Sequence, residues 1–189
     1  MKLVVSQYMS LDGVIEDPVG MEETGLGNWI GPFRHGPEGD VFKHQELMDA
    51  GAVLLGRRTY DGFAAVWPHV EEPTGYADRI NSLPKYVASR SLQETSWNNS
   101  HILSGSVAKD VGNLKDQGGG DILVFGSATL VHDLLRNGLV DELSLMIYPV
   151  VLGRGLRLFP EGWSGTLARI DQRPLGDEIA LLRYRVESV

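Results

Sequence analysis

The sequence contains no cysteine, and this absence excludes several kinds of site at once. Disulfides, thiolate zinc sites, iron–sulfur clusters and a cysteine nucleophile cannot form. Long apolar runs are also missing, because the opening apolar stretch 3–5 is followed at once by polar Ser6 and Gln7. No run reaches the roughly 18 apolar residues of a membrane-spanning helix, and the first is too short for a signal peptide. We therefore expect a cytoplasmic protein with no membrane partner.

Basic residues are scarce relative to acidic ones. The chain has 17 Lys and Arg against 25 Asp and Glu, which gives a net charge of −8 and a pI near 5.1. This balance argues against a nucleic-acid partner, because nucleic-acid binders normally present a basic face. It leaves an anionic cofactor open, since a few local arginines can hold phosphates within an acidic protein.

Signatures of metal sites and of common enzyme classes are missing as well. The five histidines show no short metal-ligand spacing, and Gly-x-Ser-x-Gly is absent. We therefore predict no metal site and assign no Ser-His-Asp triad. The Gly-x-Gly-x-x-Gly fingerprint is also absent, so the chain is not an ordinary Rossmann domain.

What is present is an alternation of apolar strands and amphipathic helices over residues 1–189, a length that fits one domain. The pattern predicts an α/β fold with a mostly parallel central sheet, helices on its faces and an antiparallel C-terminal hairpin. Residues 16–39 form a long loop, either a lid or a mobile surface insertion. Strands are expected at 2–8, 52–55, 85–89, 101–103, 121–125, 140–152, 166–171 and 179–186; helices are expected from 40 to about 48 and at 59–66, 79–83, 107–116 and near 130–135.

The segment Gly56-Arg57-Arg58-Thr59-Tyr60 stands between a buried strand and a helix. Glycine lets a ligand approach the backbone closely, and Thr59 can cap the helix that follows. The free N–H groups of a helix N-terminus and two arginines suit phosphate oxygens. The segment alone is equally compatible with a capped helix that carries two solvated arginines.

Two further turns follow predicted strands in the same way. Ser89-Arg90-Ser91 offers small hydroxyls and one arginine, a set that suits the 2′-phosphate of NADPH. Gly126-Ser127 marks another switch from strand to helix. Three such turns at neighbouring strand ends would form one crevice, and their joint occurrence predicts a dinucleotide site.

The combination of these segments resembles the dihydrofolate reductase superfamily, and more closely the reductase domain of the bacterial riboflavin-biosynthesis deaminase/reductase and its stand-alone relatives. The matching segments occur in the family's order over nearly the whole chain: Met9–Gly13, Leu54–Tyr60, Val124–Ser127, Leu139–Leu143, Pro149–Gly155 and Leu158-Phe159. The family often has Gly-Gly where this chain has Gly126-Ser127, and in dihydrofolate reductases a cis peptide bond joins that pair.

The resemblance implies a three-layer dihydrofolate-reductase-like fold and a reductase that takes hydride from NADPH. The small heterocyclic substrate would be similar to 5-amino-6-(5-phosphoribosylamino)uracil or dihydrofolate. The alternative is a non-catalytic nucleotide- or ligand-binding module that kept the fold. Dimerisation, with segment 140–152 and the terminal hairpin pairing across a two-fold axis, is a further expectation. The implied cofactor contacts are Gly56, Arg57, Arg58, Thr59, Ser89, Arg90, Gly126 and Ser127.

Two aspartates are the candidate catalytic acids. Asp12 belongs to the Ser-Leu-Asp-Gly turn, which faces the active site in the family; it can equally be a plain turn residue. Asp40 lies sixteen positions before Gly56, where dihydrofolate reductases keep a pocket carboxylate; it can equally be an N-cap. Trp29 and Trp67 can stack a flat substrate or simply pack.

Overall fold

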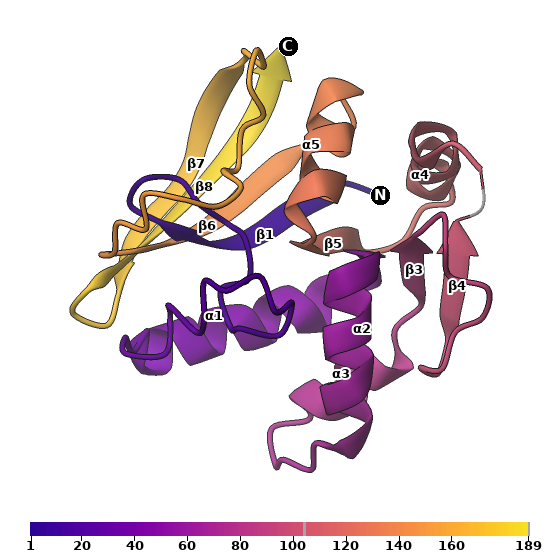
Figure 1. Cartoon of the computed structure of the whole chain (residues 1–189), viewed down its shortest axis with the longest axis horizontal. Helices are drawn as coiled ribbons and strands as arrows, with labels where there is room; N and C mark the ends of the chain where they lie inside the picture. Colours follow the sequence, from indigo (N-terminus) through magenta and orange to yellow (C-terminus); the bar gives the residue numbers. More distant parts are fainter. Residues whose placement is uncertain (104, 189) are drawn as a thin grey trace.

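The computed structural model describes residues 1–103 and 105–188, which form one mixed sheet with helices on both faces (Figure 1). The strand order is β4-β3-β2-β5-β1-β6-β8-β7. Neighbours from β4 to β6 run parallel, and β8 is antiparallel to both β6 and β7. The predicted α/β class with an antiparallel C-terminal hairpin is therefore confirmed. The strands are β1 (Leu3–Ser10), β2 (Ala50–Gly56), β3 (Lys85–Ala88), β4 (Ser100–Leu103), β5 (Asp121–Gly126), β6 (Glu142–Tyr148), β7 (Thr166–Leu175) and β8 (Ile179–Ser188).

The position of strand β2 between two hydrophobic cores explains why its sequence is continuously apolar. Its alternate side chains enter two different cores: Leu54 packs in the cluster that includes residues of α4 and α5, whereas Val53 and Leu55 pack in the cluster that includes residues of α1, α2 and α3. A parallel strand covered by helices on both faces has no polar side to present to water. The helices are α1 (Gly36–Asp49), α2 (Arg57–Val66), α3 (Tyr76–Ser82), α4 (Val107–Asp116) and α5 (Ala128–Arg136), with a 3₁₀ turn at Trp67–His69.

The start of α1 differs from the sequence-based prediction. The helix begins at Gly36 rather than Asp40, because Pro37 occupies the first turn, where its fixed φ is favourable and its missing N–H costs nothing. Gly51 lies within β2, where an added Cβ would meet the backbone N and O of Gly120 at 2.8 Å. The loop predicted over residues 16–39 therefore ends before Gly36, where α1 begins.

The predicted strand 140–152 is also too long. Strand β6 ends at Tyr148, directly before Pro149, because proline cannot donate to a sheet ladder. Residues 149–157 then run beside the end of β1, where Leu11 N–H bonds to the Val150 carbonyl. Across the described ranges, no helix has the length and apolar character needed to cross a membrane.

Candidate functional site

The carboxyl ends of β2 and β5 lie side by side, because these strands are parallel neighbours. They approach so closely that a Cβ added to Gly56 would stand 2.3 Å from Ser127 Oγ and 2.8 Å from Ser127 N. A Cβ added to Gly126 would stand 2.8 Å from Thr59 Oγ1. The structure thus brings together Gly56, Thr59, Gly126 and Ser127, as the two predicted turns require.

The peptide bond between Gly126 and Ser127 is cis, and Gly126 has a φ of +136°. This backbone conformation is one that L side chains rarely adopt, which accounts for glycine at position 126. Ser127 then precedes α5, and its hydroxyl lies 2.9 Å from Thr129 Oγ1. The Ser127 side chain, at a position where the family often has glycine, is therefore accommodated beside the start of α5.

Two helix N-termini open at this edge, that of α2 after Gly56 and that of α5 after Ser127. Such N-termini offer free N–H groups and a positive dipole to anions. The N-cap of α2 is Gly56, so the predicted capping role of Thr59 is wrong. Thr59 is the third residue of α2, and its buried hydroxyl donates a hydrogen bond to the Glu22 carboxylate.

The arginines of this segment remain at the surface. Arg57 pairs with Asp61 one turn along α2, with 2.6 Å between Nε and Oδ2. Arg58 is exposed. Strand β3 lies on the other side of β2, so Ser89 and Arg90 follow a neighbouring strand end. The Ser89 hydroxyl accepts the N–H groups of Ser91 and Leu92, which holds this turn, and Arg90 is exposed.

A pocket of about 160 Å³ opens beside these strand ends. Aromatic rings from five elements form much of its wall, and Trp67 lies 5.3 Å from Tyr76 and 6.2 Å from Phe63 between ring centroids. Trp67, one of two tryptophans considered for stacking a substrate, is therefore at the pocket. The lining includes Tyr8, Ile15, Val19, Met21, Lys43, Thr59, Phe63, Trp67, Tyr76, Phe125, Gly126 and Ser127.

Lys43 is a buried ammonium group at this pocket. Its Nζ donates to Glu46 Oε2 at 2.5 Å and to Ser6 Oγ at 2.8 Å, and it lies 4.9 Å from the ring centroid of Phe125. Burial alone would lower the pKa of Lys43, but the adjacent Glu46 carboxylate raises that pKa above its ordinary value. Lys43 therefore stays protonated.

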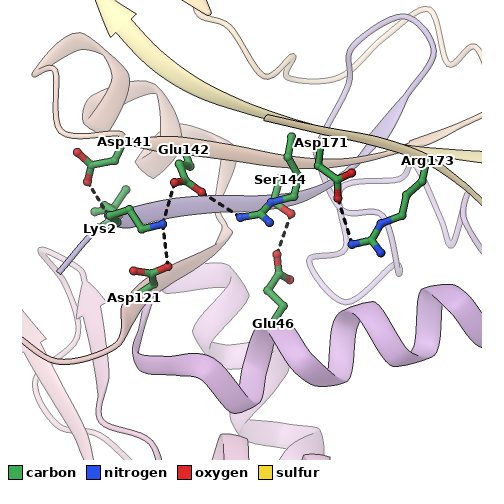
Figure 2. A network of polar contacts seen from close by, with 10 residues as sticks. Lys2, Glu46, Asp121, Asp141, Glu142, Ser144, Asp171 and Arg173 are labelled. Atoms are coloured by element: carbon green, nitrogen blue, oxygen red, sulfur yellow. Dashed lines mark hydrogen bonds and ion pairs between the residues drawn. The ribbon is translucent and has the colours of Figure 1, made fainter. Parts of the chain in front are cut away.

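Glu46 pairs with Lys43, and both oxygens of its carboxylate accept hydrogen bonds. Figure 2 shows its carboxylate directed from α1 toward Ser144 on β6, whose hydroxyl donates to Oε1 at 2.8 Å. Ser6 donates to Oε2 at 2.7 Å. Burial would raise the pKa of Glu46, but the charge of Lys43 holds that pKa below its ordinary value. The two groups form an ion pair that is fully hydrogen-bonded on the carboxylate side.

A compact turn, Asp17–Thr24, covers one side of the pocket. The buried Asp17 carboxylate accepts the N–H groups of Glu22 and Thr24 and the Thr24 hydroxyl, at 2.9 to 3.1 Å. Met21 packs over Gly62 of α2, where an added Cβ would meet the Met21 Cβ at 2.9 Å. Part of the predicted loop is therefore an ordered cover, fastened to α2 at two points by Met21 and Glu22.

The two predicted acids lie elsewhere. Asp12 accepts bonds from Leu152 N–H, Gly153 N–H and the Ser10 hydroxyl, which lower the pKa of its carboxyl to about 2. Neither Asp12 nor Asp40 is among the residues that line the pocket. The Asp40 side chain is 79% exposed and lies 3.6 Å from His35 Nδ1. The N-cap of α1 is His35, so the alternative role of Asp40 as an N-cap is wrong.

Trp29, the predicted substrate contact, lies in a different core. Its indole N–H donates to the Glu16 carbonyl at 3.0 Å, and its ring meets Tyr148 edge-on at 5.9 Å. It is buried and is not among the residues that line the pocket. This arrangement gives Trp29 a packing contact beneath the loop.

Sequence reasoning did not identify Lys43 and Glu46. The only sequence signal was their spacing of three, which puts opposite charges on one helix face. The helix was expected to begin at Asp40. Lys43 and Glu46 would then lie near its solvated N-terminal end, and this expectation obscured the signal.

The chain is an α/β protein with a dihydrofolate-reductase-like fold. Its mostly parallel sheet carries two helix N-termini and the adjoining pocket at the carboxyl ends of the parallel strands. A search with protein-family models identifies the particular family. The chain belongs to the family described as RibD C-terminal domain, whose model matches residues 1–173.

Similar proteins agree with this membership. The uncharacterized protein YwjB of Bacillus subtilis (strain 168) is 29% identical over 171 residues, 89% of this chain and 88% of that protein. The uncharacterized protein YyaP of the same organism is 36% identical over 116 residues, which span 60% of this chain and 61% of YyaP.

Solved structures share the fold. A Shewanella sp. PV-4 protein, whose name provisionally assigns it to riboflavin biosynthesis, superposes with a TM-score of 0.77 at 20% identity over 99% of both chains. Dihydrofolate reductase from Enterococcus faecalis, complexed with NADP(H) and RAB-propyl, gives 0.63 at 14% identity over 98% of this chain and 96% of that one. Acinetobacter baumannii RibD gives 0.68 at 17% identity, over 99% of this chain and 58% of that one.

Proposed function

We propose that the protein is an NADPH-dependent reductase of a small, flat heterocyclic substrate. The observation that carries this proposal is the adjacency of two features. One is the pair of helix N-termini that follow the closely packed Gly56 and Gly126, and the other is an aromatic pocket that contains a buried ammonium group. A dinucleotide needs the first feature for its phosphates, and a flat ring needs the second for stacking.

The residues at the crevice suit a dinucleotide phosphate group. At Gly56 and Gly126 a side chain would collide with Ser127 and Thr59, so glycine at these two positions lets the strand ends that precede the two helix N-termini pack together. Arg57 and Arg58 would supply charge, and Ser89 with Arg90 would meet a 2′-phosphate. When bound, NADPH would supply the hydride, and the protein would supply orientation and charge.

Within the pocket, Lys43 is the group best placed to serve the reaction. Its ammonium group carries a proton beside the aromatic walls, and Glu46 fixes its position. A fixed positive charge stabilises negative charge that develops on a substrate atom as hydride arrives. Asp12 and Asp40 remain predictions as catalytic acids, and their absence from the pocket lining favours Lys43 for this role.

Titration of the full chain with NADPH, followed by cofactor fluorescence, tests the proposal. We expect saturable binding that weakens at least about tenfold in the Arg57→Ala/Arg58→Ala double variant, since each charge-assisted hydrogen bond contributes about 1.5–3 kcal/mol. Arg136→Ala is the matched control, because Arg136 is an exposed arginine at the opposite end of α5. Absence of binding at millimolar NADPH would overturn the reductase proposal and leave a binding module that kept the fold.

A further inference from the structure

Gln7 is a buried amide side chain at the wall of the pocket. It is 5% exposed, belongs to β1 and lines the pocket together with Gly126 and Ser127. Its Nε2 donates to the Val124 carbonyl at 3.1 Å, which ties the side chain to β5 two residues before Gly126. Gln7 therefore belongs to the part of the pocket that adjoins the Gly126-Ser127 turn.

The contact with Val124 fixes the orientation of this amide. A backbone carbonyl oxygen accepts only from a donor, and the amide has donors only on Nε2. A flipped amide would put Oε1 against the Val124 oxygen, where two acceptors repel each other. Oε1 is therefore the end of the Gln7 amide that is turned away from Val124.

The Oε1 atom of Gln7 has an unused capacity to accept hydrogen bonds. Over residues 1–103 and 105–188, no group donates a hydrogen bond to it. Within the same ranges, Arg183 Nε is the only fully buried side-chain nitrogen or oxygen without a partner, so Oε1 is not sealed off. Because Gln7 is buried and lines the pocket, the opening at Oε1 leads into the pocket. A ligand that covers Oε1 without donating to it would leave a buried acceptor unpaired, which is unfavourable.

The other acceptors at the pocket are in a different situation. The Glu22 carboxylate lies on the covering turn and accepts from Thr59, and Ser6 Oγ accepts from Lys43. The tyrosine hydroxyls of the lining can donate as well as accept, so a ligand without N–H groups can still satisfy them. The requirement for an N–H donor is therefore strongest at Gln7.

We propose that Gln7 recognises the carboxamide of the nicotinamide ring, with Oε1 accepting one of the carboxamide N–H groups. This inference rests on the proposed function and assigns a specificity-determining residue to it. The nicotinamide would lie between the phosphates at the helix N-termini and the substrate in the pocket, and Gly126-Ser127 borders both places. The carboxamide is the only substituent of that ring with N–H donors, so it matches the unused acceptor of Gln7.

This contact would also orient the ring. A nicotinamide can rotate about its bond to the ribose and so present either face to the pocket. A hydrogen bond from the carboxamide to Gln7 Oε1 restricts this rotation, because Gln7 is itself held by Val124. Gln7 would thus help to determine which face of the ring delivers hydride to the substrate.

Three reduced cofactors that differ only at the carboxamide test this inference in calorimetry with the full chain. NADPH and its thionicotinamide analogue carry the N–H groups, whereas the 3-acetylpyridine analogue has a methyl group in their place. We expect the acetylpyridine analogue to bind at least about fivefold more weakly than the other two, because it leaves Oε1 unpaired. Gln7→Met, which removes the amide and keeps the length of the side chain, should abolish this difference. Gln45→Met, at an exposed glutamine of α1, should retain it.

Gln7→Asn guards against misfolding of Gln7→Met, since it keeps an amide on a shorter side chain, and it should also lose the difference. Equal binding of the three cofactors by the parent chain would overturn the inference and leave the proposed function standing. So would a difference that survives in both Gln7 variants, and its loss in Glu22→Gln instead would assign the carboxamide to the covering turn. If none of the three binds at millimolar concentration, the proposed function and this inference fall together.

Discussion

The hydroxyl of Thr59 donates a hydrogen bond to the Glu22 carboxylate, which joins the first turns of α2 to the turn that covers the pocket. Thr59 is also one of the residues predicted to meet a cofactor phosphate. A carboxylate and a phosphate that seek the same hydroxyl compete, so Glu22 must leave Thr59 before a phosphate can bind there.

Replacing Glu22 should therefore tighten NADPH binding. We expect Glu22→Ala to lower the Kd by about three- to tenfold, since the lost hydrogen bond contributes on the order of 1 kcal/mol to the closed arrangement. Fluorescence titration measures the effect. Glu23→Gln, which removes a carboxylate from an exposed neighbouring position, is the control. Weaker binding in Glu22→Ala would show instead that Glu22 supports the cofactor site.

Cofactor choice should depend on Arg90. Arg90→Ala should weaken binding of NADPH by about tenfold or more and leave NADH nearly unchanged, because only NADPH carries the 2′-phosphate. Parallel titrations with the two cofactors provide the ratio. An equal loss for both would argue against a 2′-phosphate contact at this position.

Contact between the strand ends should make Gly56 sensitive to any side chain. Gly56→Ala should reduce the free energy of unfolding by about 1–3 kcal/mol, because the new Cβ would overlap Ser127. Gly112→Ala provides the control: it lies in α4 with nothing within 4 Å of an added Cβ and should add about 0.5–1 kcal/mol. Urea unfolding of both variants measures the difference, and equal stability in the two would contradict the close approach.

Asp12 should contribute to stability in a pH-dependent way. Leu152 N–H, Ser10 and Gly153 N–H lower its pKa from 3.8 to about 2 in the folded chain. The contribution is therefore present above the unfolded-state pKa and declines as pH falls toward about 2. Asp12→Asn should cost on the order of 1 kcal/mol near neutral pH, and the deficit should shrink in denaturant titrations at lower pH. A deficit independent of pH would exclude a role for the ionised carboxylate.

The order of strands in the sheet limits which of the segments expected to form a dimer interface can pair with a second copy of the chain. Strand β6 is paired with β1 and β8, so of the segments expected to pair with a second copy only β7 is at a sheet edge. We propose that two β7 strands pair across a two-fold axis, which would cover the half-exposed Ile170. Ultracentrifugation should give twice the chain mass, and Ile170→Lys should give the monomer. A monomeric parent protein at high concentration would contradict this arrangement.

Local patterns were enough to predict much of the fold. The spacing of apolar residues identified the buried strands and the helix 107–116, because the buried face of each element determines where apolar residues recur in its own sequence. Several boundaries were wrong, including the end of β7 and the start of α3. Two of them, the start of α1 and the end of β6, lie beside a proline. Pro37 begins a helix there and Pro149 ends a strand, and proline signals either event.

The site could be predicted only in part. Gly56 and Gly126 are recognisable because close backbone approach demands glycine at strand ends. The partners of Asp12 lie at Leu152 and Gly153, and the ring that covers Trp29 belongs to Tyr148. Contacts at such sequence distances leave no local pattern, and the pairing of Lys43 with Ser6 is hidden for the same reason.

A crystal structure of the full chain with NADPH tests the central claim most directly. The claim predicts the pyrophosphate at the N-termini of α2 and α5, within hydrogen-bonding distance of Thr59, with Glu22 displaced and the nicotinamide beside Gly126-Ser127. A dinucleotide bound elsewhere, or an unchanged contact between Thr59 and Glu22 in the complex, would contradict it.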